Sequence, residues 1–283
     1  TLTLRQRKPA TSSDDHRVPL VIPVAAGLLL NGSPLAWGGE TTRVLELAEP
    51  EQSFTFEDVP DKPVLSLLRG FSAPVRVATE QPESDLLALM GGDDDAFVAW
   101  DAAQNLLSRA IEQTTSNADT TIPDALRNAC EQVMTGSMDP AMKALTLALP
   151  SEEYLADRAA QRGLVDVAAL HAQRRHVKSA LGEALSECWQ QVLSAYPAPK
   201  HYAPTADDIG IRAFRHLAQD YLLAANTAEL DAARQLYQRA DNLTDRLAAL
   251  RWIASYASPE ERADVFDTFY AKWHHEALVV NQW

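Results

Sequence analysis

The stretch PVRVATEQPESDLLALMGGDDDAFVAWDAAQNLL, residues 74–107, contains the change of pattern that decides the fold. Up to Pro82, apolar residues alternate with polar ones and prolines are frequent, as in short strands joined by tight turns. Beyond Pro82, alanine and leucine recur at helical spacing and proline falls at the ends of such runs. We therefore expect a multidomain chain, β then α: a small antiparallel β-sandwich over residues 1–80, and an all-α bundle or solenoid-like domain over residues 83–283.

Several short strands are expected before residue 80. Alternation over residues 18–24 predicts one strand, and Pro19 and Pro23 place it at a sheet edge, because proline cannot donate to a ladder. Asn31-Gly32 predicts a hairpin between residues 28–30 and 35–37, and Gly38-Gly39 predicts a further turn. The other expected strands cover residues 1–4, 44–47, 54–56 and 75–77.

Capping residues predict where the helices begin. Asp139 before Pro140 is a typical helix start, and Ser151 is expected to cap the next helix. Ser258-Pro259-Glu260-Glu261 has the capping-box arrangement, with serine at the cap and glutamate three residues later. Residues 165–196 fit one long helix or two, and Gly182 leaves both open. Other helices are expected after Asp93–Asp95, over 205–225 and after Asn242.

The overall composition is that of a globular protein, with 46% hydrophobic and 23% charged residues. A formal net charge of −14 argues against a nucleic-acid partner, since phosphate binding needs a basic face. No stretch approaches the ~20 apolar residues of a membrane helix, so no membrane partner is expected. Cys130 and Cys188 lie far apart in helical patterns and predict buried free thiols. Such thiols suit a reducing compartment, and we expect a cytoplasmic location.

The most tempting metal motif is His274-His275-Glu276, near the C-terminus. A zincin helix needs HExxH, because histidines four apart share one helix face and both reach the metal. The residue four after His275 is Val279, which cannot bind a metal. We expect a surface pair of histidines near a helix end.

The remaining polar residues are also given structural interpretations. His171 and His176 are five apart, roughly 140° around a helix, so a solvated basic patch with Arg174 and Arg175 is expected. His201 and His216 have no cysteine or paired carboxylate at ligand spacing, Asp93–Asp95 lacks the spacing of a calcium loop, and Asn242 is interpreted as a helix cap. Core packing is expected for Trp100, Trp189, Trp252 and Trp273. No catalytic, cofactor-binding or metal-ligating residue is predicted in this chain.

Both ends of the chain look cut. Thr1 begins within an alternating strand and without an initiator methionine, and Trp283 ends the chain soon after an apolar segment at 278–280. We expect a fragment.

Two blocks, SLLRGFSAPV at 66–75 and FVAWDAAQ at 97–104, resemble parts of bacterial aminopeptidase N, in the M1 family of zinc metallopeptidases. The first is similar to that family's small β-sandwich domain, and the second to the opening of its C-terminal helical domain. Residues 1–11, 51–56, 242–250 and 269–283 continue the resemblance in order.

The resemblance implies a non-catalytic role for this chain. The family's HExxH zinc site, its GxMEN motif and its catalytic tyrosine belong to domains preceding Thr1, and no position here matches them. Zinc is therefore implied for the parent enzyme, with no cofactor in this fragment. The implied partners are the missing N-terminal and catalytic domains of the same polypeptide, and the peptide substrates of the parent enzyme. The implied role is a spacer and lid that enclose the peptide chamber. The resemblance also implies that the helical domain, residues 83–283, is incomplete at its C-terminal end.

Two alternatives from other classes stay open at the level of sequence. A free-standing helical module with a β-sandwich appendage could bind a partner protein on a concave surface. A self-contained hydrolase could use histidines that folding brings together.

Overall fold

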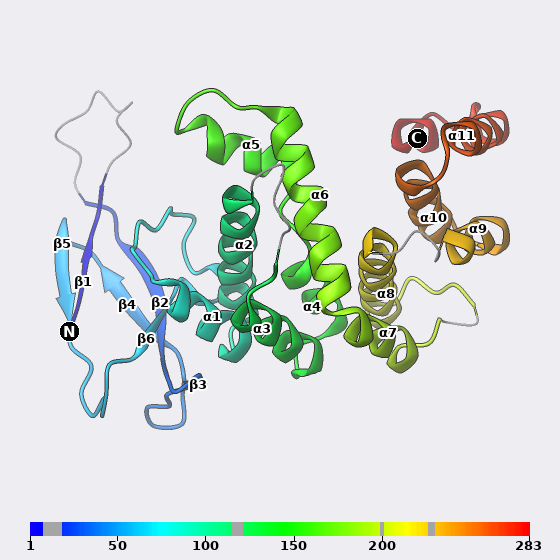
Figure 1. Ribbon diagram of the computed structural model, residues 1–283. Coiled ribbons are helices and arrows are strands. Elements are labelled where there is room, and N and C mark those ends of the chain that lie inside the picture. The colour runs from blue at the N-terminus through cyan, green and yellow to red at the C-terminus, as the bar shows by residue number, and fades with distance from the viewer. Residues whose placement is uncertain (8–18, 115–120, 199–200, 226–229) are drawn as a thin grey trace. The chain divides into compact units, whose positions relative to one another are not determined.

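The computed structural model describes residues 1–7, 19–114, 121–198, 201–225 and 230–283 (Figure 1). The chain forms two compact units. The first contains residues 1–107 and 128–136, and the second contains residues 108–127 and 137–283. Units of packing and domains need not coincide, so the division into domains at 1–80 and 83–283 stays a prediction.

The N-terminal part is an antiparallel β region with two small sheets. The described strands are β1 Leu2–Arg5, β2 Ile22–Leu30, β3 Ser33–Pro34, β4 Arg43–Leu47, β5 Glu51–Phe54 and β6 Val64–Leu67. β1 pairs with β5, while β2 pairs with β3, β4 and β6 (Figure 1). Inward-facing residues of both sheets pack into one core that includes Val24, Leu45, Leu47, Leu2 and Phe54. This arrangement confirms the expected β-then-α fold.

The edge position predicted for the strand at 18–24 is confirmed over residues 22–24, where β4 is the only described strand beside β2, although β2 begins later than expected and continues to Leu30. β2 begins at Ile22, pairs with β4 from Ile22 to Ala26, and pairs with β6 from Ala26 to Leu29. Pro23 lies in the half that has only β4 beside it, so the ladder tolerates its missing N–H there. Leu20 precedes the strand and is 71% exposed, and Val18 lies outside the described residues.

The Asn31-Gly32 hairpin is confirmed, although its second strand is displaced. Both turn residues have positive φ, as a type I′ turn requires, and Leu30 pairs with Ser33. The returning strand is β3 at 33–34, where residues 35–37 were expected. Residues 54–56 contribute only Phe54 to β5.

The strand predicted at 75–77 is also wrong, and β6 takes its place in the sheet. The backbone N–H of Val75 donates to the carbonyl of Ala73 at 2.9 Å, which closes a tight turn and removes Val75 from any ladder. Val75 and Val77 are correspondingly exposed.

Helices occupy most of the chain after residue 82. They are α1 Glu83–Gly92, α2 Ala96–Gln113, α3 Asp124–Thr135, α4 Pro140–Leu147, α5 Glu152–Ala160, α6 Val167–Ala184, α7 Ser186–Ala195, α8 Ala206–Ala225, α9 Leu230–Arg239, α10 Leu243–Tyr256, α11 Pro259–Trp273 and α12 Ala277–Gln282. The short 3-10 turn η1 covers Arg69–Phe71.

The predicted caps are confirmed at Asp139, Ser151, Asn242 and Ser258, each of which accepts a hydrogen bond from a backbone N–H of the first turn. Only half of the expected capping box forms at α11. The N–H of Glu261 donates to Ser258, but the Glu261 carboxylate accepts two hydrogen bonds from Arg234, at 2.7 and 2.8 Å. A tertiary ion pair thus takes the side chain that the local motif would have used.

Residues 165–196 form two helices, and the break falls at Leu185 rather than at Gly182. Leu185 has φ −117° and ψ 18°, outside the helical region, while Gly182 lies inside α6. Gly182 serves close packing instead: a Cβ built there would overlap the carbonyl oxygen of Tyr221 in α8. The glycine lets the backbones of α6 and α8 approach each other.

Tyr221 joins four helices of the second unit. Its ring stacks on Trp189 of α7, with centroids 4.6 Å apart and planes 9° apart. Its hydroxyl donates to the carbonyl of Leu147 at the end of α4, at 2.8 Å. With Gly182 of α6 against its backbone, Tyr221 brings α4, α6 and α7 onto α8 (Figure 1).

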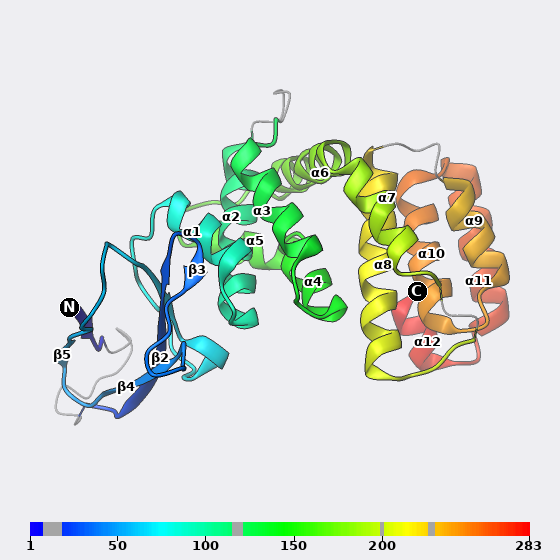
Figure 2. The same ribbon diagram turned by 90° about the horizontal axis from the view of Figure 1, so that it is seen from below.

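The last helices form a second core around α10. Figure 2 shows α9, α10, α11 and α12 grouped beside α8. Leu223 of α8 belongs to this core, so α8 takes part in both halves of the second unit. The other fully buried members are Leu230, Ala233, Ala249, Leu250, Trp252, Ile253, Val265 and Phe269. The two helical groups therefore share one central helix.

Replacing Gly182 tests the close approach of α6 and α8. We expect Gly182→Ala to lower the free energy of unfolding by about 1–3 kcal/mol, because the added methyl meets backbone that cannot move independently. Gly91→Ala in α1 is the matched control, since its Cβ meets only the flexible Gln132 side chain. Urea unfolding measures both variants, and equal stability of the two would contradict this account of Gly182.

Candidate functional site

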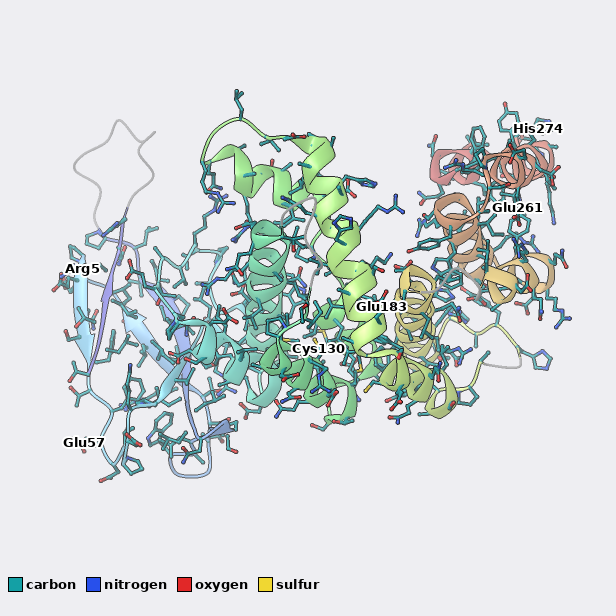
Figure 3. The ribbon with its side chains drawn as sticks, viewed as in Figure 1. Arg5, Glu57, Cys130, Glu183, Glu261 and His274 are labelled. Atoms are coloured by element: carbon teal, nitrogen blue, oxygen red, sulfur yellow. The ribbon has the colours of Figure 1, made fainter. Side chains whose placement is uncertain are left out.

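The predicted histidine pair lies on the surface. His274 and His275 follow the end of α11 and are exposed, as Figure 3 shows for His274. His274 Nδ1 lies 3.0 Å from the Ala271 carbonyl oxygen, and His275 lies 3.9 Å from Glu276. Val279 belongs to α12, so the helix break between 273 and 277 separates positions that a zincin keeps on one helix.

The basic patch on α6 is partly neutralised by neighbouring groups. His171 Nδ1 lies 2.8 Å from a carboxylate oxygen of Glu152, and Arg174 Nε donates to the carbonyl of Pro150 at 2.7 Å. Arg175 and His176 are exposed, and so is His201 before α8. These side chains tie α6 to the start of α5 and do not converge on one point.

The acidic run Asp93–Asp95 binds the protein itself. Asp93 and Asp94 both accept hydrogen bonds from Arg69, whose side chain is only 3% exposed. Arg69 also donates to the Thr41 carbonyl at 2.6 Å. Asp95 Oδ1 caps α2 through the N–H of Val98 at 3.0 Å, as expected for acids at a helix start.

Arg69 is held in place by an unusual backbone. Leu68 and Phe71 have φ values of 56° and 54°, in the left-handed region that non-glycine residues rarely adopt. The N–H of Gly70 between them donates to Asp95 at 2.8 Å. Burial raises the pKa of Asp93, and the Arg69 charge opposes that rise. The cluster connects β6 and η1 with the start of α2, all within the first unit.

Sequence spacing missed a second polar cluster, which lies between α8 and α10. His216 Nε2 lies 2.9 Å from Asp245 Oδ1, and Arg212 Nε lies 3.3 Å from the same oxygen. Asn242 Nδ2 donates to the other carboxylate oxygen at 2.7 Å. Asp245 therefore connects two side chains of α8 with the cap of its own helix.

Apolar and aromatic neighbours shield this cluster. The His216 ring meets the Trp252 ring edge to face at 5.5 Å, and the Arg212 guanidinium lies over the Tyr202 ring at 4.8 Å. Burial alone would raise the pKa of Asp245. Hydrogen bonds from His216 and Asn242, together with the Arg212 charge, instead hold that pKa below its usual range.

A histidine oriented by a carboxylate is one half of a hydrolase triad, but a reacting partner is also needed. Among the described residues, His216 hydrogen-bonds only to Asp245. The arrangement is suited to holding α8 and α10 together. The 29 residues that separate His216 from Asp245 explain why no local motif pointed to the pair.

The described part of the chain contains no group of three or more histidine, cysteine or acidic residues that could hold a metal ion. Both cysteines are free thiols: Cys130 is buried, which raises its pKa to about 12, and Cys188 is half-buried. A thiol so rarely ionised is a poor nucleophile. Within the described ranges, no helix has the length and apolar character needed to cross a membrane. The absence of functional site residues in this chain stays a prediction.

Two family models match the chain in tandem. Residues 1–80 match a domain of unknown function, DUF3458, described as an Ig-like fold, and residues 83–283 match DUF3458_C, described as ARM repeats.

Curated relatives carry the name aminopeptidase N. The protein from Caulobacter vibrioides is 33% identical over 86% of this chain and 28% of its own length. The protein from Escherichia coli is 31% identical over 100% of this chain and 33% of its own length. The chain thus spans about a third of the length of the curated relatives it matches.

A solved structure shares the fold. The crystal structure of Legionella pneumophila aminopeptidase A in complex with aspartic acid has a TM-score of 0.80, with 23% identity. The match covers 96% of this chain and 32% of that one.

Arg69→Met tests the buried ion pairs of the first unit. We expect the free energy of unfolding to fall by about 3–5 kcal/mol, because the buried carboxylate of Asp93 loses its cation. Arg5→Met, which removes the exposed ion pair with Glu51, is the control and should cost under about 1 kcal/mol. Thermal unfolding at neutral pH compares them, and equal losses would contradict the role of Arg69.

Asp245→Asn tests the joint between α8 and α10. We expect the free energy of unfolding at pH 7 to fall by about 1–2 kcal/mol. This is less than for a fully buried ion pair, because Asp245 is partly exposed. The pKa of Asp245 is lower in the folded state than in the unfolded state, where it is near 3.9. The ionised carboxylate therefore stabilises the fold above the unfolded pKa, and this stabilisation is lost as pH falls through the folded pKa. Below about pH 4, the free energy of unfolding should therefore fall less in the variant than in the wild type.

The control for Asp245→Asn is Asp231→Asn, which alters an exposed ion pair with Arg234. We expect it to change the free energy of unfolding by less than about 0.5 kcal/mol. If Asp245→Asn follows the same pH profile as the wild type, the carboxylate does not stabilise the joint.

Proposed function

Because the chain belongs to the DUF3458 family of Ig-like and ARM-repeat domains, we propose that it is the non-catalytic C-terminal part of an aminopeptidase N-like zinc metalloexopeptidase. Such an enzyme, of the M1 family, releases amino-terminal residues from peptides. The observation that carries the proposal is the match of the whole chain to about a third of a protein named aminopeptidase N.

The chemistry would belong to the rest of the parent enzyme. The described residues do not fit a zinc site, since no suitable ligand group occurs among them. The His274–His275 pair is exposed and stands across a helix break from Val279. The partners in this proposal are the remaining domains of the same polypeptide and the peptide substrates of the parent enzyme, in the cytoplasm.

The role proposed for this part is that of a spacer and lid. In this role, the antiparallel β region is the spacer, and the helices packed around α8 and α10 are the wall of the chamber. A wall around a peptide chamber excludes folded proteins and bulk water, which controls access without taking part in bond cleavage.

Assays of residues 1–283 test whether this chain by itself binds zinc or hydrolyses an aminopeptidase substrate. We expect less than about 0.1 zinc ion bound per chain after dialysis against micromolar zinc, since structural and catalytic zinc sites use three or four protein ligands. We also expect no hydrolysis of alanine 4-nitroanilide. Metal analysis and absorbance measure these outcomes. Stoichiometric zinc together with activity that both disappear in His274→Ala/His275→Ala would overturn the proposal.

A chimera tests the lid. In Escherichia coli aminopeptidase N, the matching third is exchanged for residues 1–283, or for residues 1–80 alone. We expect both chimeras to keep their zinc, and the shorter one to hydrolyse a 20-residue peptide faster, relative to alanine 4-nitroanilide, than the longer one. If both chimeras bind zinc and have the same ratio of peptide hydrolysis to alanine 4-nitroanilide hydrolysis, the proposed lid role is wrong. The family assignment would not be affected.

A further inference from the structure

A polar pocket opens in the first unit beside the Gly38-Gly39 turn. Its volume of about 480 Å³ falls within the roughly 300–1,000 Å³ of small-ligand sites. Its walls come from the turn before β4, the start of β4 and the segment between β5 and β6, where Figure 3 labels Glu57. The lining side chains include Trp37, Glu40, Arg43, Thr55, Glu57 and Asp58.

The backbone fixes Trp37 at this pocket. The N–H of Trp37 donates to the Glu40 carbonyl at 2.7 Å, and the N–H of Glu40 donates back to Trp37 at 3.1 Å. Gly38 and Gly39 have φ values of 61° and 93°, which such a tight turn requires. The Trp37 ring also packs on Phe56, with centroids 5.4 Å apart. An aromatic side chain is therefore held at the pocket wall before any ligand arrives.

The charged side chains at the pocket have no partner among the residues that the structure describes. Glu40, Glu57, Asp58 and Arg43 make no hydrogen bond or ion pair through their side chains in the described part of the chain. Elsewhere on this unit, Glu51 is paired with Arg5. Three carboxylates against one guanidinium give the pocket a net negative charge, which favours a cation.

The size and chemistry of the walls indicate what kind of cation fits. The acidic residues do not form a group that could hold a metal ion. An ammonium group on a carbon chain can place its charge by the carboxylates and its methylenes against Trp37, where a cation–π contact adds to the attraction. The Arg43 guanidinium remains for the amide or carboxylate oxygens of the same molecule.

We propose that this pocket binds the ammonium group of a peptide, between Trp37 and the carboxylates of Glu57 and Asp58. The ammonium comes from the peptide's amino terminus or from a lysine side chain. The proposal does not depend on the chain being part of a peptidase, because it rests on the pocket alone.

Ligand-observed NMR titration of residues 1–283 tests the proposal with three probes. Alanine amide presents an α-ammonium, Nα-acetyl-lysine amide presents a side-chain ammonium, and Nα-acetyl-norleucine amide is the neutral match of the second. We expect at least one ammonium probe to saturate below about 10 mM and the neutral probe not to bind. Raising the salt from 0.05 to 0.5 M should weaken binding several-fold, because the site is open to solvent.

Charge-matched variants locate the binding. We expect Glu57→Gln/Asp58→Asn to weaken the ammonium probe about tenfold. Glu46→Gln/Glu49→Gln removes the same charge from exposed positions that do not line the pocket, and should keep the affinity within about twofold. Glu40→Gln, in the exposed turn, gives an independent second variant should the first fail to fold by circular dichroism.

Three results would overturn the proposal. They are no saturation by either ammonium probe, equal binding of Nα-acetyl-norleucine amide, or equal weakening by the two double variants. None of these results bears on the zinc and hydrolysis assays, so the two proposals fail separately.

Discussion

The close contact between Gly182 of α6 and the backbone of Tyr221 in α8 is the constraint on which the second unit depends. Because the two backbones nearly touch, the Tyr221 ring reaches Trp189 and its hydroxyl reaches the carbonyl at the end of α4. The carbonyls at the end of a helix lack partners within it, and this hydroxyl satisfies one of them. One buried aromatic residue thereby sets the positions of three helices around a fourth.

Buried arginine side chains also hold separate elements of the fold together. Arg69 in the first unit and Arg212 in the second are almost fully buried. Acceptors from separate elements surround Arg69, while Arg212 lies between the carboxylate of Asp245 and the ring of Tyr202. A buried guanidinium is costly unless carboxylates and carbonyls surround it, so such a cluster tolerates few alternative arrangements. In both units the acids sit at a helix start, Asp95 beside α2 and Asp245 in α10, where the helix dipole also favours them.

The side chains of both polar clusters are engaged in contacts that stabilise the fold. His216 has the carboxylate partner of a catalytic histidine, yet that carboxylate also holds Arg212 and the cap residue Asn242. At the Trp37 pocket, by contrast, Glu40, Arg43, Glu57 and Asp58 make no side-chain hydrogen bond or ion pair with any residue that the structure describes. Those side chains contribute little to the fold and are free to serve a ligand.

The sequence by itself determined the order of structure classes, the helix caps and the hairpin at Asn31-Gly32, because these depend on neighbours within a few residues. It also contained the resemblance that led to the family. It placed Pro23 correctly where β2 has a single neighbour, but it could not show that β2 continues to Leu30 and pairs there with β6. Only the tertiary structure decided that Gly182 packs against Tyr221 instead of breaking a helix, that Glu261 leaves its capping box for Arg234, and that His216 meets Asp245. In each case the deciding partner lies far away in the chain, where spacing along the sequence carries no information about distance in space.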